Sequence, residues 1–457
     1  MTVEHRLLPE TPYRTLDDYI AAGGGSGLEA LDHMGSTAAI AEIRASGLRG
    51  RGGAGFPTAI KLGGVASAVA DRKFVVANVS EGEPGTFKDR WMLQNNPYSL
   101  LEGITIAGLA VGAEQAFIGI KHKHHAAIDA LERAAVEMVD AGMIGQIQIT
   151  IVRGPDVYLF GEEKGLLEVI EGREAKPRLY PPYMNGLFEV QGSALNPTSV
   201  NNAETLSHLP NILARGADWF RSAGTEESTG TMIFALGGDT AVNTVVELPL
   251  GTTMRELVEV HGGGTLSGRP IKMITNGVSN RPIRPEHLDV PLSYEGLRSI
   301  GSGLGSAGFT VYDDTICAVQ AMGAYAAFNA RGSCGQCVPC KVGTTELAVR
   351  LLALADGRGG AQQMDEISGW VAKVTDWNRC GLGAGQQALV GGQMGHDAQL
   401  DLRIVRGQQH AALRRDKRPA NAPPLLGPDR DVLQIGVGGR QAARGGHGLV
   451  VRRVDAA

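Results

Sequence analysis

Four of the five cysteines have the spacing of ligands to an inorganic centre. Cys334, Cys337 and Cys340 form a C-x-x-C-x-x-C segment, and Cys380 follows forty residues later in DWNRC. Closely spaced thiolates repel one another unless a cation holds them. A [4Fe–4S] cluster needs one thiolate for each iron, often three from a compact loop and one from further along the chain. Zinc also binds four cysteines, but usually as two C-x-x-C pairs, so the spacing favours a cluster while zinc stays open.

A glycine-rich loop near the N-terminus has the composition of a phosphate cradle. Residues 47–61 read GLRGRGGAGFPTAIK, where the glycines allow close backbone approach and Arg49, Arg51 and Lys61 add positive charge. Backbone N–H groups exposed beside cations bind anions. The segment is neither a G-x-G-x-x-G fingerprint nor a P-loop, because no G-K-[ST] follows. A flexible surface turn is the alternative interpretation.

Alternating strands and helices must position this loop. Residues 73–90 read KFVVANVSEGEPGTFKDR, which predicts a buried strand over 74–79 followed by a polar loop. Further strands are expected at 116–120 and over the alternating isoleucines of 147–151, each separated from the next by a helical pattern. This alternation predicts a mostly parallel sheet, and ligands bind at the carboxyl edge of such sheets.

Two further polar pairs are candidates for ligand contact. Glu162 and Glu163 follow a glycine and precede a helical pattern, and Asn201 and Asn202 are adjacent amides suited to a polar ring or a sugar. Acids at a helix start can also serve only the helix dipole, so that alternative stays open for the glutamates. The HKHH stretch at 122–125 precedes a helical pattern, and we expect it to be a solvated surface rather than a metal site.

Composition limits the class of protein. The chain has 457 residues, 43% of them hydrophobic and 64 of them glycine, which indicates several domains on a glycine-rich α/β scaffold. A formal net charge of −5 gives no reason to expect a nucleic acid partner. We find no apolar run of about 18 residues and no signal-peptide pattern in MTVEHRLLPE. We therefore expect a cytoplasmic protein, in which clustered cysteines indicate metal or redox chemistry.

The motifs, taken in order, resemble a known family. GLRGRGGAGFPT, SEGEPGTFKDR, GEE, VNNAET, GSGLGSAG and SCGQCVPCKVGT follow the order found in the flavin- and NADH-binding subunit of respiratory complex I. The same family includes the flavoprotein subunits of NAD-dependent formate dehydrogenases and NAD-reducing hydrogenases. The resemblance covers about residues 14–390 and implies an α/β fold. Its parts would be a Rossmann-like FMN/NADH-binding domain with a parallel sheet (14–225), a small β-grasp domain of the SLBB type (228–295) and a helical [4Fe–4S]-binding domain (305–395).

The resemblance also assigns roles to individual residues. It implies that Glu83 and Glu163 act at the catalytic site by positioning the nucleotide and by electrostatics. It implies cluster ligation by Cys334, Cys337, Cys340 and Cys380. It places cofactor contacts at Gly50, Arg51, Gly52, Gly53, Phe56, Lys61, Asn78, Tyr158, Gly161, Glu162, Val200, Asn201 and Asn202.

The activity implied is that of an NADH dehydrogenase flavoprotein subunit with FMN, NAD and a [4Fe–4S] cluster. Hydride passes from NADH to FMN, and single electrons continue to the cluster and to partner subunits. The expected partners are a thioredoxin-like [2Fe–2S] subunit and a further iron–sulfur subunit of a complex like complex I, a formate dehydrogenase or a hydrogenase. Through them the protein would be at most peripheral on the cytoplasmic face of the inner membrane.

Three positions depart from the family pattern on the nucleotide side. The usual adenine-stacking aromatic, three residues after Lys61, is Gly64; the basic residue before the double proline is Tyr180; and the aspartate before EGEPGT is Ser80. Losing one stacked ring costs on the order of 1 kcal/mol, which weakens nucleotide binding without forbidding it. One alternative is therefore an FMN/[4Fe–4S] electron relay that no longer uses NADH. Another, from the cysteines alone, is a zinc-binding interaction protein.

The C-terminal stretch differs in composition from the rest of the chain. Residues 401–457 hold ten Arg and one Lys against five Asp, and no aromatic residue follows Trp377. We expect residues 400–457 to be a basic tail, either disordered or read in a shifted frame, and the Arg-, Gly-, Ala- and Pro-rich composition favours the shifted frame.

Overall fold

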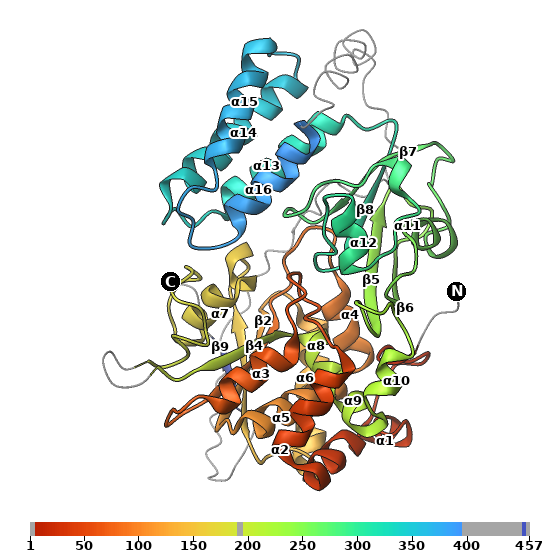
Figure 1. The fold of residues 1–457 in the computed structure, drawn as a ribbon, viewed down its shortest axis with the longest axis vertical. Helices are drawn as coiled ribbons and strands as arrows, with labels where there is room; N and C mark the ends of the chain where they lie inside the picture. Colours follow the sequence, from red (N-terminus) through yellow and green to blue (C-terminus); the bar gives the residue numbers. More distant parts are fainter. Residues whose placement is uncertain (1–4, 190–194, 395–449, 454–457) are drawn as a thin grey trace.

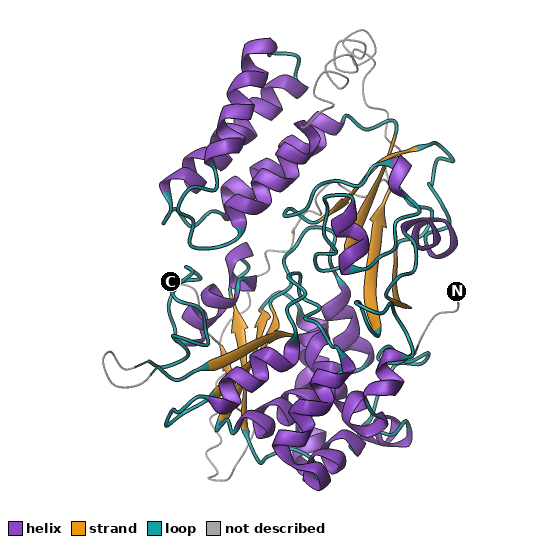
Figure 2. Cartoon of the chain, in the orientation of Figure 1, coloured by secondary structure: helices purple, strands orange, loops and turns teal. Residues whose placement is uncertain are grey.

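The computed structural model describes residues 5–189, 195–394 and 450–453. An α/β domain, a second sheet and a group of C-terminal helices follow one another along the chain (Figure 1). Figure 2 shows that the strands gather in two separate sheets, while the C-terminal domain is helical. The predicted α/β fold with a parallel sheet and a helical C-terminal domain is therefore confirmed.

A five-stranded parallel sheet forms the centre of the first domain. The strand order is β4-β1-β2-β3-β9, and all neighbouring pairs are parallel. The three strands expected from the sequence are confirmed as β1, β2 and β3. The strands of this sheet are β1 (Phe74–Val79), β2 (Gln115–Lys121), β3 (Gln148–Gly154), β4 (Thr198–Asn202) and β9 (Val450–Arg453).

Strand β9 corrects part of the prediction for the tail. Residues 450–453 pair with β3 along its free edge, so the expectation of a disordered tail is wrong for this short segment, while the shifted frame stays a prediction. The remainder of the predicted tail, 400–449 and 454–457, lies outside the described residues.

Helices cover both faces of the parallel sheet. Strand β1 is apolar on both sides, as a strand buried between two layers must be. Val75, Ala77 and Val79 pack into one core with the long helices, whereas Phe74 and Val76 pack against α7 on the opposite face. The helices of this domain are α1 (Leu16–Ala21), α2 (Ser26–Ser46), α3 (Thr58–Ser67), α4 (Lys88–Asn95), α5 (Pro97–Val111), α6 (His125–Asp140), η1 (Tyr158–Gly161), α7 (Glu163–Ile170), α8 (Ala203–Ser207), α9 (Leu209–Arg215) and α10 (Ala217–Arg221).

Helix α5 shows how the sequence sets these elements. Asn96 caps its first turn by accepting a hydrogen bond from the Ser99 backbone N–H at 3.2 Å, and Pro97 occupies the first helical position. Gly112 ends the helix in the left-handed region with φ 73°. Nearly every side chain between these signals is buried, so α5 runs through the core rather than over it.

The second sheet has four strands in the order β6-β5-β8-β7. Its centre is the parallel pair β5–β8, and the outer pairs are antiparallel. The boundary expected at residue 295 cuts this sheet, because GFTVYD at 308–313 forms a central strand rather than part of the helical domain. Its elements are β5 (Thr231–Gly238), β6 (Thr244–Pro249), α11 (Met254–Glu256), η2 (Leu257–His261), β7 (Ile271–Asn276), η3 (Pro285–His287), α12 (Tyr294–Ser299) and β8 (Gly308–Asp313).

Four helices make the third domain. They pack around a core that includes Leu347, Leu351, Ile367 and Leu389. The last helix follows Cys380 directly, and its buried Gln386 accepts a hydrogen bond from Asn329 at 2.8 Å. The helices are α13 (Ala318–Gly332), α14 (Val338–Ala355), α15 (Ala361–Lys373) and α16 (Leu382–Met394).

A buried ion cluster joins the first domain to the second sheet. The fully buried Lys88 ammonium lies 2.7 Å from an Asp89 carboxylate oxygen and 2.6 Å from one of Glu204. The other oxygen of Glu204 accepts the backbone N–H of Ile233 in β5 at 2.8 Å. Burial alone would raise the pKa of Glu204, but the charge of Lys88 and the hydrogen bonds hold that pKa at about 2. Glu204 is therefore ionised at neutral pH and depends on its countercharge.

We predict that Lys88→Met lowers the free energy of unfolding by about 3–5 kcal/mol, because two buried carboxylates lose their countercharge. Urea unfolding followed by circular dichroism measures the effect. The double variant K88M/E204Q should recover part of the loss, since one of the uncompensated charges is then removed. A K88M protein as stable as the wild type would contradict the account.

A second prediction concerns the N-terminal segment, which Glu247 anchors to β6. One carboxylate oxygen accepts the backbone N–H groups of Leu7 and Leu8, both at 2.8 Å. Burial raises the pKa of Glu247 from 4.5 to about 7. The unfolded chain thus loses this proton near pH 4.5 and the folded chain only near pH 7, so stability falls as pH rises through this window.

Glu247→Gln removes that contribution. We expect the Tm difference between variant and wild type to shift in favour of the variant as pH is raised from 5 to 8. Thermal unfolding at several pH values tests this, and a difference that does not change with pH would contradict it.

Candidate functional site

A cavity of about 460 Å³ lies where the three domains meet. The first domain contributes the glycine-rich loop, the carboxyl ends of β1 and β4, and the turn before α7. The second contributes Val278, Ser279 and the loop at Gly305 and Ser306. The third contributes Asn329 of α13 and the segment around Cys380. The carboxyl edge of the parallel sheet, where the sequence predicted a ligand, is thus one wall of the cavity.

Almost all predicted cofactor residues line this one cavity. They come from segments more than one hundred residues apart, and only the fold brings them together. The exception among them is Arg51. The predicted residues that line the cavity are Gly50, Gly52, Gly53, Phe56, Lys61, Asn78, Glu83, Tyr158, Gly161, Glu162, Glu163, Val200, Asn201 and Asn202.

Arg51 points away from the cavity. Its side chain is fully buried and donates to the backbone carbonyl of Thr229 at 2.8 Å, and its backbone N–H donates to the hydroxyl of Thr205 at the same distance. These bonds hold the loop to α8 and to the chain just before β5. The expected phosphate contact of this guanidinium is therefore not supported, although its backbone remains part of the loop.

The glycine loop rests on the second domain. The Tyr294 hydroxyl of α12 donates to the carbonyl of Gly50 at 2.7 Å, and the Arg49 guanidinium stacks on the Tyr294 ring. At Gly52, a Cβ would approach the side chain of Asn202 to 2.9 Å. Gly53 has φ 137°, which favours glycine. The loop is an ordered cavity wall rather than the flexible turn that the sequence left open.

Lys61 is the one cationic side chain among the described residues that line the cavity. Its ammonium donates to the carbonyl of Val200 at 3.1 Å and forms an ion pair with Glu163 at 3.3 Å. These contacts hold the Lys61 ammonium next to β4 and the start of α7, beside the glycine loop. An ammonium next to exposed backbone is suited to bind a phosphate.

The adjacent amides are fixed by the first domain itself. Asn202 caps α8 and donates to an Asp89 carboxylate oxygen at 2.7 Å, so the buried ion cluster sets its orientation. Asn78 donates to the carbonyl of Gly161 at 2.8 Å and thereby ties β1 to the turn before α7. Asn201 donates to the hydroxyl of Ser199 at 3.0 Å. Rigid amides at a strand edge can orient a polar ring through hydrogen bonds.

Several acids line the same space, and burial disfavours their charges. The pKa of Glu81 is raised to about 7, first by burial and then by the nearby Asp89. Burial also raises the pKa of Glu162. Glu162 caps α7 by accepting backbone N–H groups of Lys164 and Gly165 at 3.0 and 2.9 Å, so the helix-start role left open by the sequence is confirmed for this residue.

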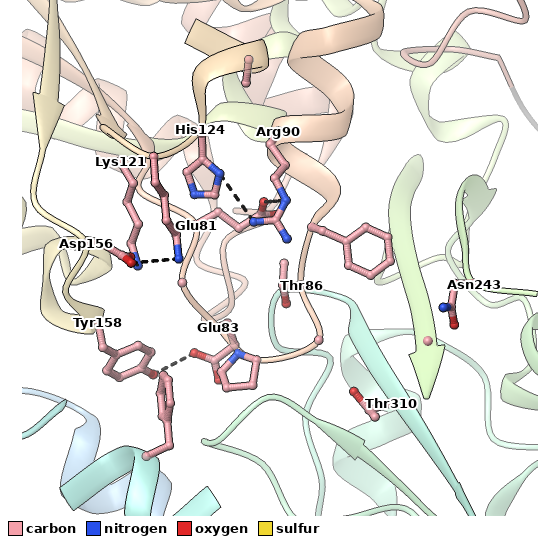
Figure 3. A pocket seen from close by; sticks show the side chains of 18 of the residues that line it. Glu81, Glu83, Thr86, Arg90, Lys121, His124, Asp156, Tyr158, Asn243 and Thr310 are labelled. Atoms are coloured by element: carbon pink, nitrogen blue, oxygen red, sulfur yellow. Dashed lines mark hydrogen bonds and ion pairs between the residues drawn. The ribbon is translucent and has the colours of Figure 1, made fainter. Parts of the chain in front are cut away.

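Glu83 ties the loop after β1 to η1 of the same domain and to the second domain. One of its oxygens accepts the Tyr158 hydroxyl at 2.7 Å (Figure 3), and the other accepts the backbone N–H of Val278 at 2.7 Å. A Cβ at Gly277 would lie 2.1 Å from the Glu83 carboxylate, so this approach requires glycine there. Burial raises the pKa of Glu83 despite these hydrogen bonds. The hydrogen bonds show that Glu83 holds the loop after β1 in place, while its role toward the nucleotide stays a prediction.

A second cavity of about 970 Å³ lies on the other side of this loop (Figure 3). In it Lys121 pairs with Asp156 at 3.1 Å, and His124 lies 3.5 Å from the Arg90 guanidinium. The solvated surface expected for HKHH is wrong at His124, which is buried where β2 turns into α6. Burial and neighbouring cations lower its pKa to about 4, so it is neutral at pH 7.

The four predicted cysteine ligands converge at one place. Cys334, Cys337, Cys340 and Cys380 line a single small enclosed space with Leu159 and Leu382. Burial raises the pKa of Cys380 to about 11 and also raises the pKa of Cys340, so their thiolates require a cation. Donors toward sulfur are present, as the backbone N–H of Arg379 lies 3.3 Å from Cys337 Sγ.

The arrangement of these sulfurs fits a cluster by its chemistry. Four cysteines and no other ligand type meet in an apolar surrounding, which is the usual donor set of [4Fe–4S]. Within the part of the chain that the structure describes, no group of three or more His, Cys, Asp or Glu could hold a metal ion. A [4Fe–4S] cubane does not need its thiolates to meet on one ion, because each thiolate binds a different iron of the cluster.

The two sites share a wall. Cys380, Leu159 and Leu382 line both the 460 Å³ cavity and the small sulfur-lined space. Tyr158, beside Leu159, packs its ring edge-on against Phe328 of α13 with centroids 5.1 Å apart. A group bound in the 460 Å³ cavity would therefore lie directly next to a group bound by the four sulfurs.

The three departures from the family pattern lie at different places. Ser80 lines the cavity and donates its hydroxyl to the carbonyl of Gly119 at 3.2 Å. Gly64 does not line the cavity, and a Cβ there would have no heavy atom within 4 Å. Tyr180 is 52% exposed and lies outside the cavity lining. An aromatic surface at position 64 is thus missing and is not replaced locally by another side chain.

Sequence reasoning missed several residues that shape the site. The cavity is also lined by Glu81, Asp89 and Ser306. Lys88 and Glu204 do not line it, but their buried ion pair holds Asp89 in place. The acids stand in the SEGEPGTFKDR and VNNAET motifs themselves, so their motif membership was an available signal. The serine likewise stands in the GSGLGSAG motif, but only tertiary structure brings that segment from the second domain to the cavity.

Comparison with known proteins agrees with this geometry. The Nuo51 FMN-binding domain family matches residues 43–211, and the NADH-ubiquinone oxidoreductase-F iron-sulfur binding region matches residues 320–396. These two matches contain the cavity residues of the first and third domains and all four cysteines. The prediction of FMN and a [4Fe–4S] cluster is thereby confirmed, and the cluster is favoured over zinc.

Full-length relatives extend the match over most of the chain. The F 2 subunit of NADH-quinone oxidoreductase from Rhizobium meliloti is 37% identical over 380 residues, covering 81% of this chain and 89% of the relative. The corresponding F subunit from Streptomyces coelicolor is 38% identical, covering 81% and 84%. The HndC subunit of the NADP-reducing hydrogenase from Solidesulfovibrio fructosivorans is 35% identical, covering 81% and 76%.

A solved structure shows the same fold. An NAD⁺-reducing [NiFe]-hydrogenase in the air-oxidised state matches with a TM-score of 0.74 and 29% identity, covering 90% of this chain and 69% of that chain. Among the described residues, no helix is both long enough and apolar enough to cross a bilayer.

We predict that Lys61→Met weakens FMN binding about 10- to 100-fold, as expected when one charge-assisted phosphate contact is lost. Fluorescence titration of flavin-depleted protein measures the Kd. Lys73→Met is the matched control, because Lys73 stands before β1 and contacts the carbonyl of Ala66 instead of the cavity. Equal Kd values for both variants and the wild type would contradict the assignment of Lys61.

Proposed function

The chain belongs to the family of NADH-quinone oxidoreductase F subunits, and we propose that it oxidises NADH and delivers single electrons to partner subunits. The observation that carries the proposal is the shared wall of Cys380, Leu159 and Leu382 between the two sites. The 460 Å³ cavity would hold FMN, which would supply hydride acceptance, and the four cysteines would hold a [4Fe–4S] cluster, which would supply one-electron transfer.

The chain's own residues supply position and environment. Lys61 and the glycine loop offer contacts for a phosphate, while Asn78 and Asn202 hold fixed amides at the strand edge. Glu83 and Tyr158 join the loop after β1 to the other domains and so keep the cavity wall in place. Alignment of donor and acceptor is the main contribution that a protein makes to hydride transfer.

Partner subunits follow from the chemistry and from the relatives. The matched relatives are named as subunits of quinone-linked and hydrogenase enzymes. We propose a thioredoxin-like [2Fe–2S] subunit and a further iron–sulfur subunit as partners. We also propose a cytoplasmic location, at most peripheral to the inner membrane through those partners.

A second candidate function is an electron relay that has lost NADH. It is favoured by Gly64, where open space stands in place of a stacking ring, and by the exposed Tyr180. The lost ring weakens nucleotide binding by on the order of 1 kcal/mol, which lowers affinity several-fold without abolishing it. We therefore favour NADH oxidation.

An anaerobic titration with NADH distinguishes the two functions. We expect the flavin absorbance near 450 nm, a property of the free cofactor, to fall as NADH is added and to be lost at about one and a half equivalents per flavin, because NADH supplies two electrons while the flavin takes two and the cluster one. Gly64→Phe should lower the NADH concentration needed, because it restores a ring for stacking.

The relay would show tight FMN and an unchanged flavin spectrum with NADH, although dithionite still reduces it. Protein that binds no FMN after anaerobic reconstitution would contradict both functions. Gly369→Phe is the matched control, because it adds a ring on α15, also where a Cβ meets no heavy atom within 4 Å.

A further inference from the structure

Helix α6 begins at the 970 Å³ cavity that lies beside the loop after β1. Its first three residues, His125, Ala126 and Ala127, line this cavity. Its first turn contains no acid, and the N-cap residue His124 makes no side-chain hydrogen bond to it. At the start of α7, by comparison, Glu162 accepts two backbone N–H groups. The N–H groups and the dipole at the start of α6 therefore favour an anion in the cavity.

His124 itself brings a buried donor to the same place. The residue is only 8% exposed. Its Nδ1 lies 3.5 Å from the Arg90 guanidinium, which can only donate, so the proton of the neutral ring belongs on Nε2. None of the residues that the structure describes accepts a hydrogen bond from Nε2. In Figure 3 the His124 ring extends from the same cavity wall as Lys121 and Arg90. A buried N–H without an acceptor is costly, and this one indicates that the acceptor is a ligand.

Positive charge exceeds negative charge on this wall of the cavity. Lys121 and Lys123 share one acid, because both pair with Asp156, at 3.1 and 2.9 Å. Arg90 lies 3.7 Å from Glu81, and burial raises the pKa of Glu81 to about 7, so this acid is only partly ionised at neutral pH. Cations at the positive end of a helix are unfavourable unless an anion compensates them. The side chains around the start of α6 thus favour the same kind of ligand as its backbone.

The cavity has room for more than a small ion. Its volume of about 970 Å³ lies within the range of about 300–1,000 Å³ that is usual for small-molecule sites. The half-buried rings of Phe87 and Phe328 line it as well. Asp239 and Arg331, which line it from the second and third domains, have opposite charges and leave the balance positive. A molecule that carries both a phosphate and a ring would therefore match these walls.

The loop after β1 separates this cavity from the 460 Å³ cavity. Glu81, Glu83 and Thr86 line both. The Lys121 ammonium reaches the loop, because a Cβ at Gly82 would lie 2.6 Å from its Nζ. Ligands on the two sides of the loop would occupy different spaces, so both can be bound at the same time.

We propose that the 970 Å³ cavity binds a phosphate group at the start of α6, held by the backbone N–H groups of that helix, by His124 and by Lys123. The phosphate is either the free ion or part of a phosphate ester whose ring packs on Phe87 or Phe328. Binding is reversible and changes no covalent bond. The site is additional to the proposed function, which uses the 460 Å³ cavity and the four cysteines.

The test titrates the reconstituted full-length protein, loaded with FMN, with phenyl phosphate and with inorganic phosphate by isothermal titration calorimetry. Loading FMN first keeps both probes out of the flavin cavity. We expect saturable binding of one probe molecule per chain. Tighter binding of phenyl phosphate would identify a phosphate ester that also uses the aromatic rings, whereas equal affinities would identify the free ion, and both results support the phosphate site.

His125→Pro and Lys123→Gln are the two site variants. Proline at the first helical position removes one backbone N–H and is tolerated there, and the preceding His124, with ψ 57°, already lies outside the α region. In K123Q the acid Asp156 keeps its pair with Lys121, so no acid is left unpaired. We expect each variant to weaken phosphate binding about tenfold or more, as when one hydrogen bond to a charged group is lost.

Each site variant has a matched control. His125→Ala removes the exposed imidazole of His125 but keeps its backbone N–H. Lys373→Gln removes an exposed lysine of α15 that lines neither cavity. Both controls should bind the probes within about twofold of the wild type, because surface substitutions alter the fold little. All four variants should retain FMN as the wild type does, which shows that they are folded.

The absence of saturable binding of both probes to the wild type would overturn the proposal. So would H125P and K123Q proteins that both bind as tightly as the wild type, because the phosphate would then lie elsewhere. Release of FMN by the probes would also overturn it, since they would then occupy the flavin cavity. NADH takes no part in this experiment, so its outcome does not depend on whether the proposed function holds.

Discussion

The buried contact between Lys88 and Glu204 is the constraint on which the site depends. Lys88 belongs to the segment after β1 and Glu204 to α8, which follows β4 directly, and through Ile233 the same carboxylate reaches the second sheet. Asp89 continues the cluster and orients Asn202. Two neighbouring strands and two domains are thus held in register by charges that cannot separate without being left unpaired in a dry interior. Such an arrangement gives the cavity its fixed walls.

Next to this fixed centre, the cavity, the four cysteine sulfurs and the protein surface follow one another in that order. The polar strand edge and Lys61 lie at one end, and the apolar wall of Leu159 and Leu382 separates the cavity from the four cysteines. Beyond them the outer cysteines lie close to solvent, under exposed apolar side chains. A protein that passes electrons needs this order, because its entry and its exit must not compete for the same surface.

Much of this was predictable from the sequence because the informative residues stand in local motifs. The glycine loop, the acid pair before α7, the adjacent asparagines and the four cysteines could all be read without coordinates. What could not be read depends on tertiary packing. Arg51 is turned into the interior by Thr205 and Thr229, which lie far from it in the chain. The central strand β8 looked like the start of the helical domain because a single short apolar run does not reveal its pairing.

The most direct test of the account is electron paramagnetic resonance of the cluster after anaerobic addition of NADH, in protein with and without FMN. Dithionite establishes how much cluster each sample contains. If the flavin cavity feeds the four sulfurs through their shared wall, NADH reduces the cluster in the FMN-loaded protein and leaves it oxidised in the flavin-free protein. Equal reduction in both samples, or flavin that is reduced while the cluster never responds, would contradict the central claim.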